Sequence, residues 1–379
     1  MRNKRANIII LIIIVTLIAI YAGHFLFWKE EKVQLAVEKS VDITDSSAKS
    51  TPFPVVHKSL STEINGRPQK INILEIDLSS EGLKIKPVLS HDLVYGFEKL
   101  SSIASRSNAY AAVNAGFFYQ YGEPGGMVVI NGKLITKSTG RYPVFIVDGK
   151  KAALEVIDTG IWISHGTNKI KAGSINSSGK PGEIVLYTPE FGLDNRANKL
   201  NTSVIIEDNK VKRIYRGDGA CIIPENGKVL TFFEPLSFDL KAYPFSAGDP
   251  VKVSYEPEFG SDYQAYECGS WLVKKGKPAA VDRDEWVGLL TNRDPRTAVG
   301  IKHDGKVVLI TVDGRQPGYS AGLSAKELAD YLVDYGIKDA AMLDGGASTE
   351  MIVDGRIVNK PSFKGRERML GGGIIVTID

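Results

Sequence analysis

The sequence predicts an α+β fold: a single β-rich domain with a mixed sheet that contains a parallel strand–helix–strand unit, preceded by one N-terminal transmembrane helix. A helix with well-marked ends lies between two short apolar runs in the C-terminal part of the chain. Most of the remaining chain consists of short apolar or alternating runs separated by glycine-containing turns, which is typical of β-structure. A long uncharged stretch near the N-terminus predicts the membrane span.

The helix of this unit is predicted from the signals at its two ends. Ser324 is the expected N-cap, because Glu327 three residues later completes a capping box. Leu323 and Leu328 stand where the two members of a hydrophobic staple are found. Gly336 is expected to end the helix, because glycine readily takes the left-handed conformation of a helix end.

The two strands of the unit are predicted over residues 307–312 (VVLITV) and 339–343 (DAAML). A crossover of this kind normally makes both strands parallel in one sheet, so Asp313 and Asp344, which follow them, should face the same edge. Ligands bind at that edge in such sheets. The alternative is that both acids are turn residues, because each precedes a glycine and Asp-Gly is a common turn pair. Their matched positions favour a site.

The stretch from residue 6 to residue 28 is uncharged, rich in isoleucine and leucine, and long enough to cross a hydrocarbon core about 30 Å thick. Basic residues before it predict a cytoplasmic N-terminus, so we expect a single-pass protein of the cell membrane with its bulk outside. A cleaved signal peptide is the alternative, although residues 19–23 lack a convincing cleavage site. The predicted regions are a cytoplasmic tail (1–7), a signal anchor (8–28), a stalk (29–50) and a folded domain (51–379).

Composition sets limits on the remaining classes of protein. The chain has 379 residues, of which 43% are hydrophobic and 24% are charged, as in an ordinary globular protein. Its formal charge of +3 is small and dispersed, so no nucleic-acid partner is expected. Cys221 and Cys268 can form a disulfide outside the cell, although the sequence does not establish the pairing. The five histidines show no metal-ligand spacing, so no metal site is predicted.

The chain before the strand–helix–strand unit reads mainly as β-structure. Residues 55–89 have the pattern of antiparallel hairpins, and residues 140–260 that of successive short strands. Residues 97–108 predict a short helix, and residues 109–113 predict a strand that ends at Asn114. Asn114 is therefore a third polar residue at a strand end, although it could simply cap a turn.

Several motifs in separate parts of the chain carry a family resemblance. They are VNAGFF (113–118), PRTAVG (295–300), the VDG that contains Asp313, LDGGAS (343–348) and VDGRIVNKPS (353–362). These motifs resemble those of the phosphodiester glycosidase family, and the similarity runs from about residue 52 to the C-terminus. It departs at Ala347, where the family more often has a third glycine. The resemblance implies an enzyme that hydrolyses a sugar–phosphate diester.

The resemblance and the strand-end positions together give the catalytic candidates. Asp344 is the first candidate for base or nucleophile, and Asp313 is its expected partner. Asn114 is expected to hold the sugar or to orient water. Parallel strands would place the two acids about 5 Å apart if adjacent, or about 10 Å apart across one intervening strand, and the sequence does not choose between these distances.

A second group of candidates should bind the phosphate. The departing phosphate monoester has a second pKa of about 6, so charge stabilisation matters more than a general acid. Arg296 and Arg315 are expected to clamp it, because a guanidinium matches phosphate oxygens; a surface position is the alternative for Arg296. The amides of Gly345 and Gly346 are expected to line the anion. The other candidates for substrate contact are Thr297, Ser348, Glu350 and Arg368.

The sequence therefore predicts hydrolysis of a glycosyl-1-phosphodiester, with N-acetylglucosamine-1-phosphate as the expected linkage, in an extracytoplasmic glycopolymer or glycoconjugate. The alternative is a non-catalytic envelope protein that binds or organises a phosphate-containing polysaccharide. The expected partners are such a glycan and, through residues 8–28, the membrane. No cofactor is predicted, and a divalent-cation requirement and the oligomeric state stay open. Three aromatic residues are candidates either for stacking on a sugar ring or for core packing: Trp162, Tyr187 and Phe191.

Overall fold

The computed structural model of the chain describes residues 53–237 and 245–379. The predicted tail (1–7), anchor (8–28) and stalk (29–50) fall outside these residues. Within the described ranges, no helix combines the length and the hydropathy that a membrane span requires. The described chain is β-rich, with mostly antiparallel sheets and two α-helices, α2 (Leu100–Arg106) and α3 (Ala325–Asp334).

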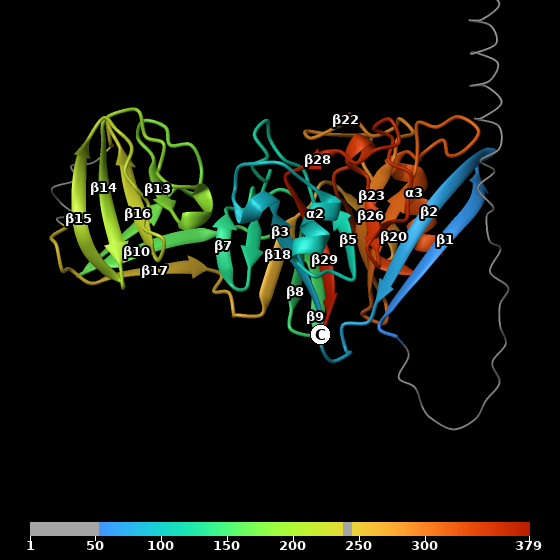
Figure 1. Cartoon of the computed structure of the whole chain (residues 1–379), viewed down its shortest axis with the longest axis horizontal. Coiled ribbons are helices and arrows are strands. Elements are labelled where there is room, and N and C mark those ends of the chain that lie inside the picture. The colour runs from blue at the N-terminus through green and yellow to red at the C-terminus, as the bar shows by residue number, and fades with distance from the viewer. Residues whose placement is uncertain (1–52, 238–244) are drawn as a thin grey trace, which may run out of the picture. The chain divides into compact units, whose positions relative to one another are not determined.

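A seven-stranded sheet carries the C-terminal strand–helix–strand unit, and α3 packs against its β19, β20 and β25 (Figure 1). In order across the sheet, the strands are β1 (Val55–Ile64), β2 (Arg67–Ile76), β24 (Val307–Val312), β23 (Arg296–Lys302), β25 (Ile337–Met342), β19 (Trp271–Lys274) and β20 (Lys277–Pro278). The predicted helix and both of its flanking strands are thus confirmed as β24, α3 and β25.

The two strands of the unit run in the same direction, but they are not neighbours. β23 lies between β24 and β25 and is antiparallel to both. Every neighbouring pair in this sheet is antiparallel, so the mixed sheet expected for this unit is wrong. Asp313 and Asp344 still follow strands that end at the same edge, and two strand spacings separate those ends by about 10 Å.

Burial on both faces explains the apolar run of β24. Val307 and Leu309 belong to one core, which also contains Ala111 and Val113 of β5 (Ala111–Asn114). Val308, Ile310 and Val312 belong to another core, which includes residues of α3. The strand is buried along its whole length. A strand covered on both sides has no solvent face, so its sequence is continuously apolar rather than alternating.

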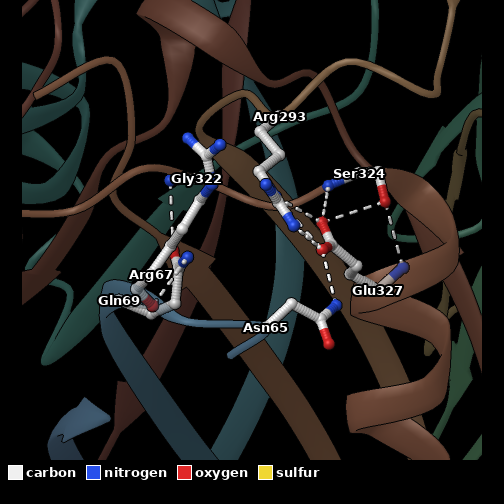
Figure 2. A network of polar contacts seen from close by, with 7 residues as sticks. All are labelled: Asn65, Arg67, Gln69, Arg293, Gly322, Ser324 and Glu327. Carbon is white, nitrogen blue, oxygen red and sulfur yellow. Dashed lines mark hydrogen bonds and ion pairs between the residues drawn. The ribbon is translucent and has the colours of Figure 1, made fainter. Parts of the chain in front are cut away.

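The start of α3 is fixed by the predicted capping box. Ser324 is the N-cap, and its reciprocal hydrogen bonds with Glu327 are both present. Figure 2 shows the Glu327 carboxylate between Arg293, Ser324 and Asn65. Arg293 Nε donates to the two Glu327 oxygens over 3.1 and 3.0 Å, and Asn65 Nδ2 donates over 2.8 Å. The Arg293 guanidinium is the largest cause that lowers the pKa of Glu327, to about 2.

The segment that precedes α3 also packs tightly against the loop before β23. Gly322 has a φ of +84°, and a Cβ there would lie 2.5 Å from the Asp294 carbonyl oxygen, so this position requires glycine. Its N–H donates to Gln69 Oε1 over 3.1 Å (Figure 2). Asp294 and Leu323 exchange backbone hydrogen bonds of 3.3 and 3.1 Å. The loop that leads into β23 is therefore held by α3 and β2 together.

A second, five-stranded sheet brings Asn114 to the same region. In order, its strands are β27 (Arg356–Ile357), β26 (Met351–Val353), β5 (Ala111–Asn114), β29 (Gly372–Ile378) and β3 (Leu83–Leu89). β5 lies between β26 and β29 and is antiparallel to both. Asn114 is the last residue of β5 and is opposite Gly373 on β29. The strand predicted before Asn114 is confirmed, with its bounds moved by one or two residues.

The remaining described strands form five further sheets. They are β7 (Lys133–Thr136), β6 (Val128–Ile130), β18 (Tyr263–Glu267), β8 (Val144–Asp148) and β9 (Lys151–Glu155); β12 (Ser174–Ile175), β13 (Ile184–Tyr187), β16 (Gly227–Phe233), β14 (Asn201–Glu207) and β15 (Lys210–Gly217); β11 (Asn168–Ala172), β10 (Gly160–His165) and β17 (Val251–Glu256); β21 (Arg283–Asp284) with β22 (Gly288–Leu289); and β28 (Met369–Leu370) with β4 (Glu98–Lys99). The 3₁₀ turns are η1 (Ser90–Asp92), η2 (Pro189–Phe191) and η4 (Gly346–Ser348).

The structure distinguishes between alternatives that the sequence left open for four side chains. Cys221 and Cys268 are both buried and free, and they belong to different core clusters, so they form no disulfide. Tyr187 and Phe191 pack against each other in a core cluster with ring centroids 4.7 Å apart. The core alternative therefore holds for these two rings, and neither is open to a sugar.

Candidate functional site

Asn114 joins the two sheets through its side-chain amide. Its Oδ1 accepts hydrogen bonds from Thr297 Oγ1 over 2.8 Å and from the Glu350 N–H over 3.2 Å. Its Nδ2 donates to the backbone carbonyls of Asp344 and Ala115 over 2.6 and 3.2 Å. The amide and its Thr297 partner are buried and engaged with the protein. The sequence suggested that Asn114 and Thr297 contact the substrate. In the structure they instead position the backbone of Asp344 and Glu350.

The turn between β25 and β26 carries five of the eleven predicted site residues. Gly346 donates its N–H to the Pro295 carbonyl over 2.8 Å, and the Gly345 N–H hydrogen-bonds the Asp344 carboxylate. Both glycine amides are thus used inside the protein. We expected these amides to line a bound anion. In the structure they instead form hydrogen bonds that stabilise the turn around Asp344.

Asp344 is a half-buried carboxyl at the start of this turn. Burial raises its pKa from 3.8 to about 6, while the Ser348 hydroxyl, the Arg368 charge and the Gly345 N–H act in the opposite direction. A carboxylate in this range is mostly ionised at neutral pH and is still basic enough to accept a proton. Asp344 is therefore suited to act as a base.

Glu350, six residues later, is fully buried. Its Oε1 accepts a hydrogen bond from the Arg368 N–H over 2.8 Å, and its Oε2 has no hydrogen-bond partner among the described residues. Burial raises its pKa to about 8, and the Arg368 N–H is the strongest opposing contact. Glu350 is thus mostly protonated at neutral pH, so its free oxygen can donate a hydrogen bond.

Arg368 connects the two carboxyls. Its Nη1 donates to Ser348 Oγ over 3.1 Å, and its guanidinium lies 5.4 Å from the centre of the Phe118 ring. Its charge acts on both Asp344 and Glu350. We call Asp344, Ser348, Glu350 and Arg368 the carboxyl cluster, and all four were predicted from the sequence.

Asp313 lies apart from this cluster and is already saturated with hydrogen bonds. Its carboxylate accepts from Asn359 Nδ2 over 3.0 Å, from the Lys360 N–H over 3.1 and 3.0 Å, and from the Tyr319 hydroxyl over 3.3 Å. Burial raises its pKa, and these donors oppose the shift. Asp313 therefore holds the segment that starts at Asn359. The partnership with Asp344 stays a prediction, at the separation of about 10 Å that one intervening strand gives.

Arg296 also differs from expectation. Its side chain is buried, its Nε donates to the Leu323 carbonyl over 2.9 Å, and its Nη2 donates to the Asn292 carbonyl over 2.8 Å. Burial lowers the pKa of the guanidinium. These contacts hold two loop segments together at the ends of β23 and α3. Arg296 is therefore a structural residue rather than the phosphate clamp that the sequence suggested.

Arg315 is the better placed of the two predicted phosphate ligands. Its Nε pairs with Asp294 Oδ1 over 2.7 Å, and about half of its side chain is exposed (51%). Its guanidinium lies against Gly346, because a Cβ added there would meet Arg315 Nη2 at 3.2 Å. An exposed guanidinium beside the turn that carries Asp344 can reach a bound anion.

Three residues near these groups were missed by the sequence interpretation. Asn359 and Lys360 hold Asp313, and Tyr319 adds the third donor. Asn359 and Lys360 belong to the VDGRIVNKPS motif, so that motif was the available signal. In the part of the chain that the structure describes, no group of three or more histidine, cysteine and acidic side chains could hold a metal ion.

Comparison with known proteins supports the motif resemblance. Residues 199–377 match the model of the phosphodiester glycosidase family. The SPbeta prophage-derived protein YomE of Bacillus subtilis is 37% identical over 98 residues, which are 26% of this chain and 15% of that protein. The bovine N-acetylglucosamine-1-phosphodiester alpha-N-acetylglucosaminidase is 34% identical over 74 residues, which are 20% of this chain and 14% of the enzyme. The chain thus spans a small part of the length of these relatives.

The fold is also found in a solved structure. A protein from Synechocystis superposes with a TM-score of 0.71 at 19% identity, covering 86% of this chain and 62% of that one. The carboxyl cluster falls inside the residues matched by the family model, whereas Asn114 precedes them. Residues 199–377 are therefore similar to the phosphodiester glycosidase family, and the matched stretch contains the whole carboxyl cluster.

Proposed function

We propose that this protein hydrolyses a glycosyl-1-phosphodiester bond, with N-acetylglucosamine-1-phosphate as the linkage, in a glycopolymer or glycoconjugate outside the cytoplasm. The observation that carries the proposal is the carboxyl cluster. In it, Arg368 interacts both with Asp344, an ionised and basic carboxylate, and with Glu350, a neutral carboxylic acid. The family match and the activity named for the bovine relative support the choice of bond.

In this proposal Asp344 is the general base. It takes a proton from water while the water oxygen forms a bond to the anomeric carbon of the sugar. The bond between that carbon and the phosphate oxygen breaks, and its electrons leave with the phosphate monoester. The second pKa of such a monoester is about 6, so the leaving group needs little protonation.

The phosphate side of the site is assigned to Arg368 and Arg315. A phosphodiester carries one negative charge, and the negative charge on the phosphate grows as the leaving oxygen departs. Guanidinium groups stabilise this charge most effectively where water is partly excluded from the site. Glu350 is fully buried and contributes by staying neutral, because an ionised carboxylate would repel the phosphate. The burial that keeps Glu350 protonated thus serves phosphate binding.

The test is release of reducing sugar from an alkyl phosphodiester of N-acetylglucosamine-1-phosphate. Asp344→Asn keeps the shape of the turn but removes the base, so turnover should fall by at least about a hundredfold with substrate affinity nearly unchanged. Asp354→Asn is the matched control, because Asp354 is an exposed Asp-Gly turn residue between β26 and β27. If wild-type protein binds the substrate and releases no sugar, the non-catalytic binding alternative replaces this proposal.

We also propose that residues 8–28 anchor the protein in the cell membrane with the glycosidase domain outside. Their length and lack of charge support this, as do the basic residues before them. Fractionation of cells that express the full chain should place it in the membrane pellet, resistant to salt and carbonate extraction. Recovery from the medium with a new N-terminus near residue 23 would mean that a signal peptide had been removed.

A further inference from the structure

A cluster of aromatic rings borders the candidate site without taking part in it. The Trp286 ring stacks on Phe117 with centroids 5.4 Å apart and planes 5° apart. Tyr119 and Tyr142 approach the same indole at 5.5 and 6.2 Å. Phe117 is buried, whereas Tyr119 is 52% exposed. The cluster therefore has a packed base and one ring that faces solvent.

The backbone of Trp286 is linked to the strand that leads to the carboxyl cluster by a chain of hydrogen bonds. The Met342 N–H, at the end of β25, donates to the Ser270 carbonyl over 3.0 Å, and Ser270 Oγ donates to Asp284 Oδ2 over 3.0 Å. Asp284 Oδ1 accepts from the N–H groups of Trp286 and Val287 over 3.0 and 2.8 Å. Met342 precedes Asp344 by two residues, so the aromatic cluster and the catalytic turn are parts of one rigid assembly.

The hairpin that carries Tyr119 separates the aromatic cluster from Arg368. The hairpin is closed by hydrogen bonds from the Tyr119 N–H to Glu123 and from the Gly125 N–H to Phe117, both 2.8 Å. Successive side chains of an extended segment point to opposite sides. Phe117 and Tyr119 accordingly contact Trp286, whereas Phe118 contacts Arg368. A ligand ring on Tyr119 therefore lies on the opposite side of this segment from Arg368.

The Tyr119 ring is also held in place before any ligand arrives. A Cβ added to Gly125 would lie 2.3 Å from the Trp286 ring, so the hairpin packs against the indole without space for a side chain. Holding a tyrosine ring costs little conformational entropy on binding, since the side chain has only two torsions. An exposed, prearranged ring with an apolar face and a polar edge suits the C–H face of a sugar.

We infer that Tyr119, supported by Trp286, is a distal sugar subsite, and that the substrate carries a glycan of more than one sugar unit across the 116–125 hairpin. This inference rests on the proposed function for the position of the scissile bond. In this inference a single sugar held at Asp344 stays on the Arg368 side of the hairpin, and only a longer glycan extends to Tyr119. The ring consequently contributes only to longer substrates.

The experiment compares two substrates, an alkyl phosphodiester of N-acetylglucosamine and the corresponding chitotriosyl phosphodiester. Tyr119→Ala should raise KM for the chitotriosyl substrate about three- to tenfold, as expected for loss of one stacked ring, and should leave the single-sugar substrate unchanged. Tyr119→Phe keeps the ring and should behave like wild type. Tyr121→Ala is the matched control, because Tyr121 is 62% exposed on the same hairpin and lies outside the ring cluster.

Binding is measured separately from turnover, by the change in tryptophan fluorescence when Asp344→Asn protein is titrated with chitotriose, with Trp286→Phe protein showing how much of the change comes from Trp286 among the four tryptophans. A saturable change that Tyr119→Ala abolishes and Tyr121→Ala preserves supports the subsite, even if no substrate is hydrolysed and the proposed activity fails. The subsite is rejected if Tyr119→Ala affects both substrates equally, if it affects neither, or if Tyr121→Ala has the same effect on chitotriose. A thermal melt of each variant shows that the comparison is made on folded protein.

Discussion

Asn114 Nδ2 donates a hydrogen bond of 2.6 Å to the backbone carbonyl of Asp344. These residues are 230 positions apart in the sequence and end strands in different sheets. The bond fixes the backbone of the catalytic candidate, while its side chain stays available for chemistry. The position of Asp344 therefore depends on a residue that need not touch the substrate.

Removal of this amide should loosen the whole turn. Asn114→Ala deletes four hydrogen bonds and leaves buried groups on Thr297, Glu350 and Asp344 without partners, so we expect a loss of about 2–4 kcal/mol in the free energy of unfolding. Thr297→Val removes one of these bonds and should cost about 1 kcal/mol. Urea denaturation measures both. Equal effects of the two changes would contradict the central position assigned to Asn114.

The activity should have a bell-shaped pH profile. Asp344 must be ionised to act as a base, which requires a pH above about 6, and Glu350 must be neutral so that it does not repel the phosphate, which requires a pH below about 8. Glu350→Gln keeps a neutral donor and removes the ionisation, so the alkaline limb of kcat/KM should disappear while the acidic limb remains. An alkaline limb that persists in Glu350→Gln would assign that ionisation to another group.

Glu350 should also make stability depend on pH. Its pKa is raised from 4.5 to about 8 in the folded protein, so its neutral form is favoured by folding. The contribution is fully present below pH 4.5 and is lost as pH rises toward 8 and beyond, by about 2 kcal/mol or more. Glu350→Gln should therefore be more stable than wild type at pH 8 and less sensitive to pH between 5 and 8. Thermal melts across this range provide the measurement.

The two arginines expected to bind phosphate should now give different phenotypes. Arg296→Met leaves the carbonyls of Asn292 and Leu323 without donors and should cost about 2–4 kcal/mol of stability. Arg315→Ala breaks an exposed ion pair with Asp294 and should cost less than about 1 kcal/mol while raising KM. Denaturation curves and steady-state kinetics separate these effects. A folded, stable Arg296→Met protein that has lost only substrate affinity would restore the clamp interpretation.

The two cysteines should behave as buried thiols. Burial raises the pKa of both Cys221 and Cys268, so neither is a reactive thiolate at neutral pH. The native protein should react slowly with a thiol reagent, and two thiols per chain should react at once after unfolding in denaturant without reductant. A reaction that requires prior reduction would show that the disulfide exists.

Local signals predicted the helix and the principal strands well. Ser324, Glu327 and Gly336 mark α3 because capping is encoded within a few neighbouring residues. The position of β23 between β24 and β25 could not be predicted from the sequence, because strand order depends on pairing between segments that are far apart in the chain. The two Asp-Gly turns are also indistinguishable in sequence, because the hydrogen-bond donors around each carboxylate are set by tertiary contacts. Asp313 is saturated with such donors, and Asp344 is not.

The carboxyl cluster was predicted residue by residue, but the properties of its members were not. Glu350 is neutral because it is buried, and its burial follows from the packing of β26 against β5. Such a tertiary contact is not visible in the local sequence. Arg296 resembled a phosphate ligand because an arginine before a strand looks the same in sequence whether it binds an anion or holds two loops. The aromatic cluster around Trp286 was missed because its rings come from segments more than a hundred residues apart.

The place of β5 in its sheet limits how the protein can be shortened. A fragment limited to residues 199–377 would contain every member of the carboxyl cluster but would lack β5, and β26 and β29 would then face each other across a missing strand. Each would expose an unpaired edge of apolar residues, which invites aggregation. The smallest unit that can fold and be assayed is thus larger than the region that sequence similarity marks, and expression work should begin near residue 53.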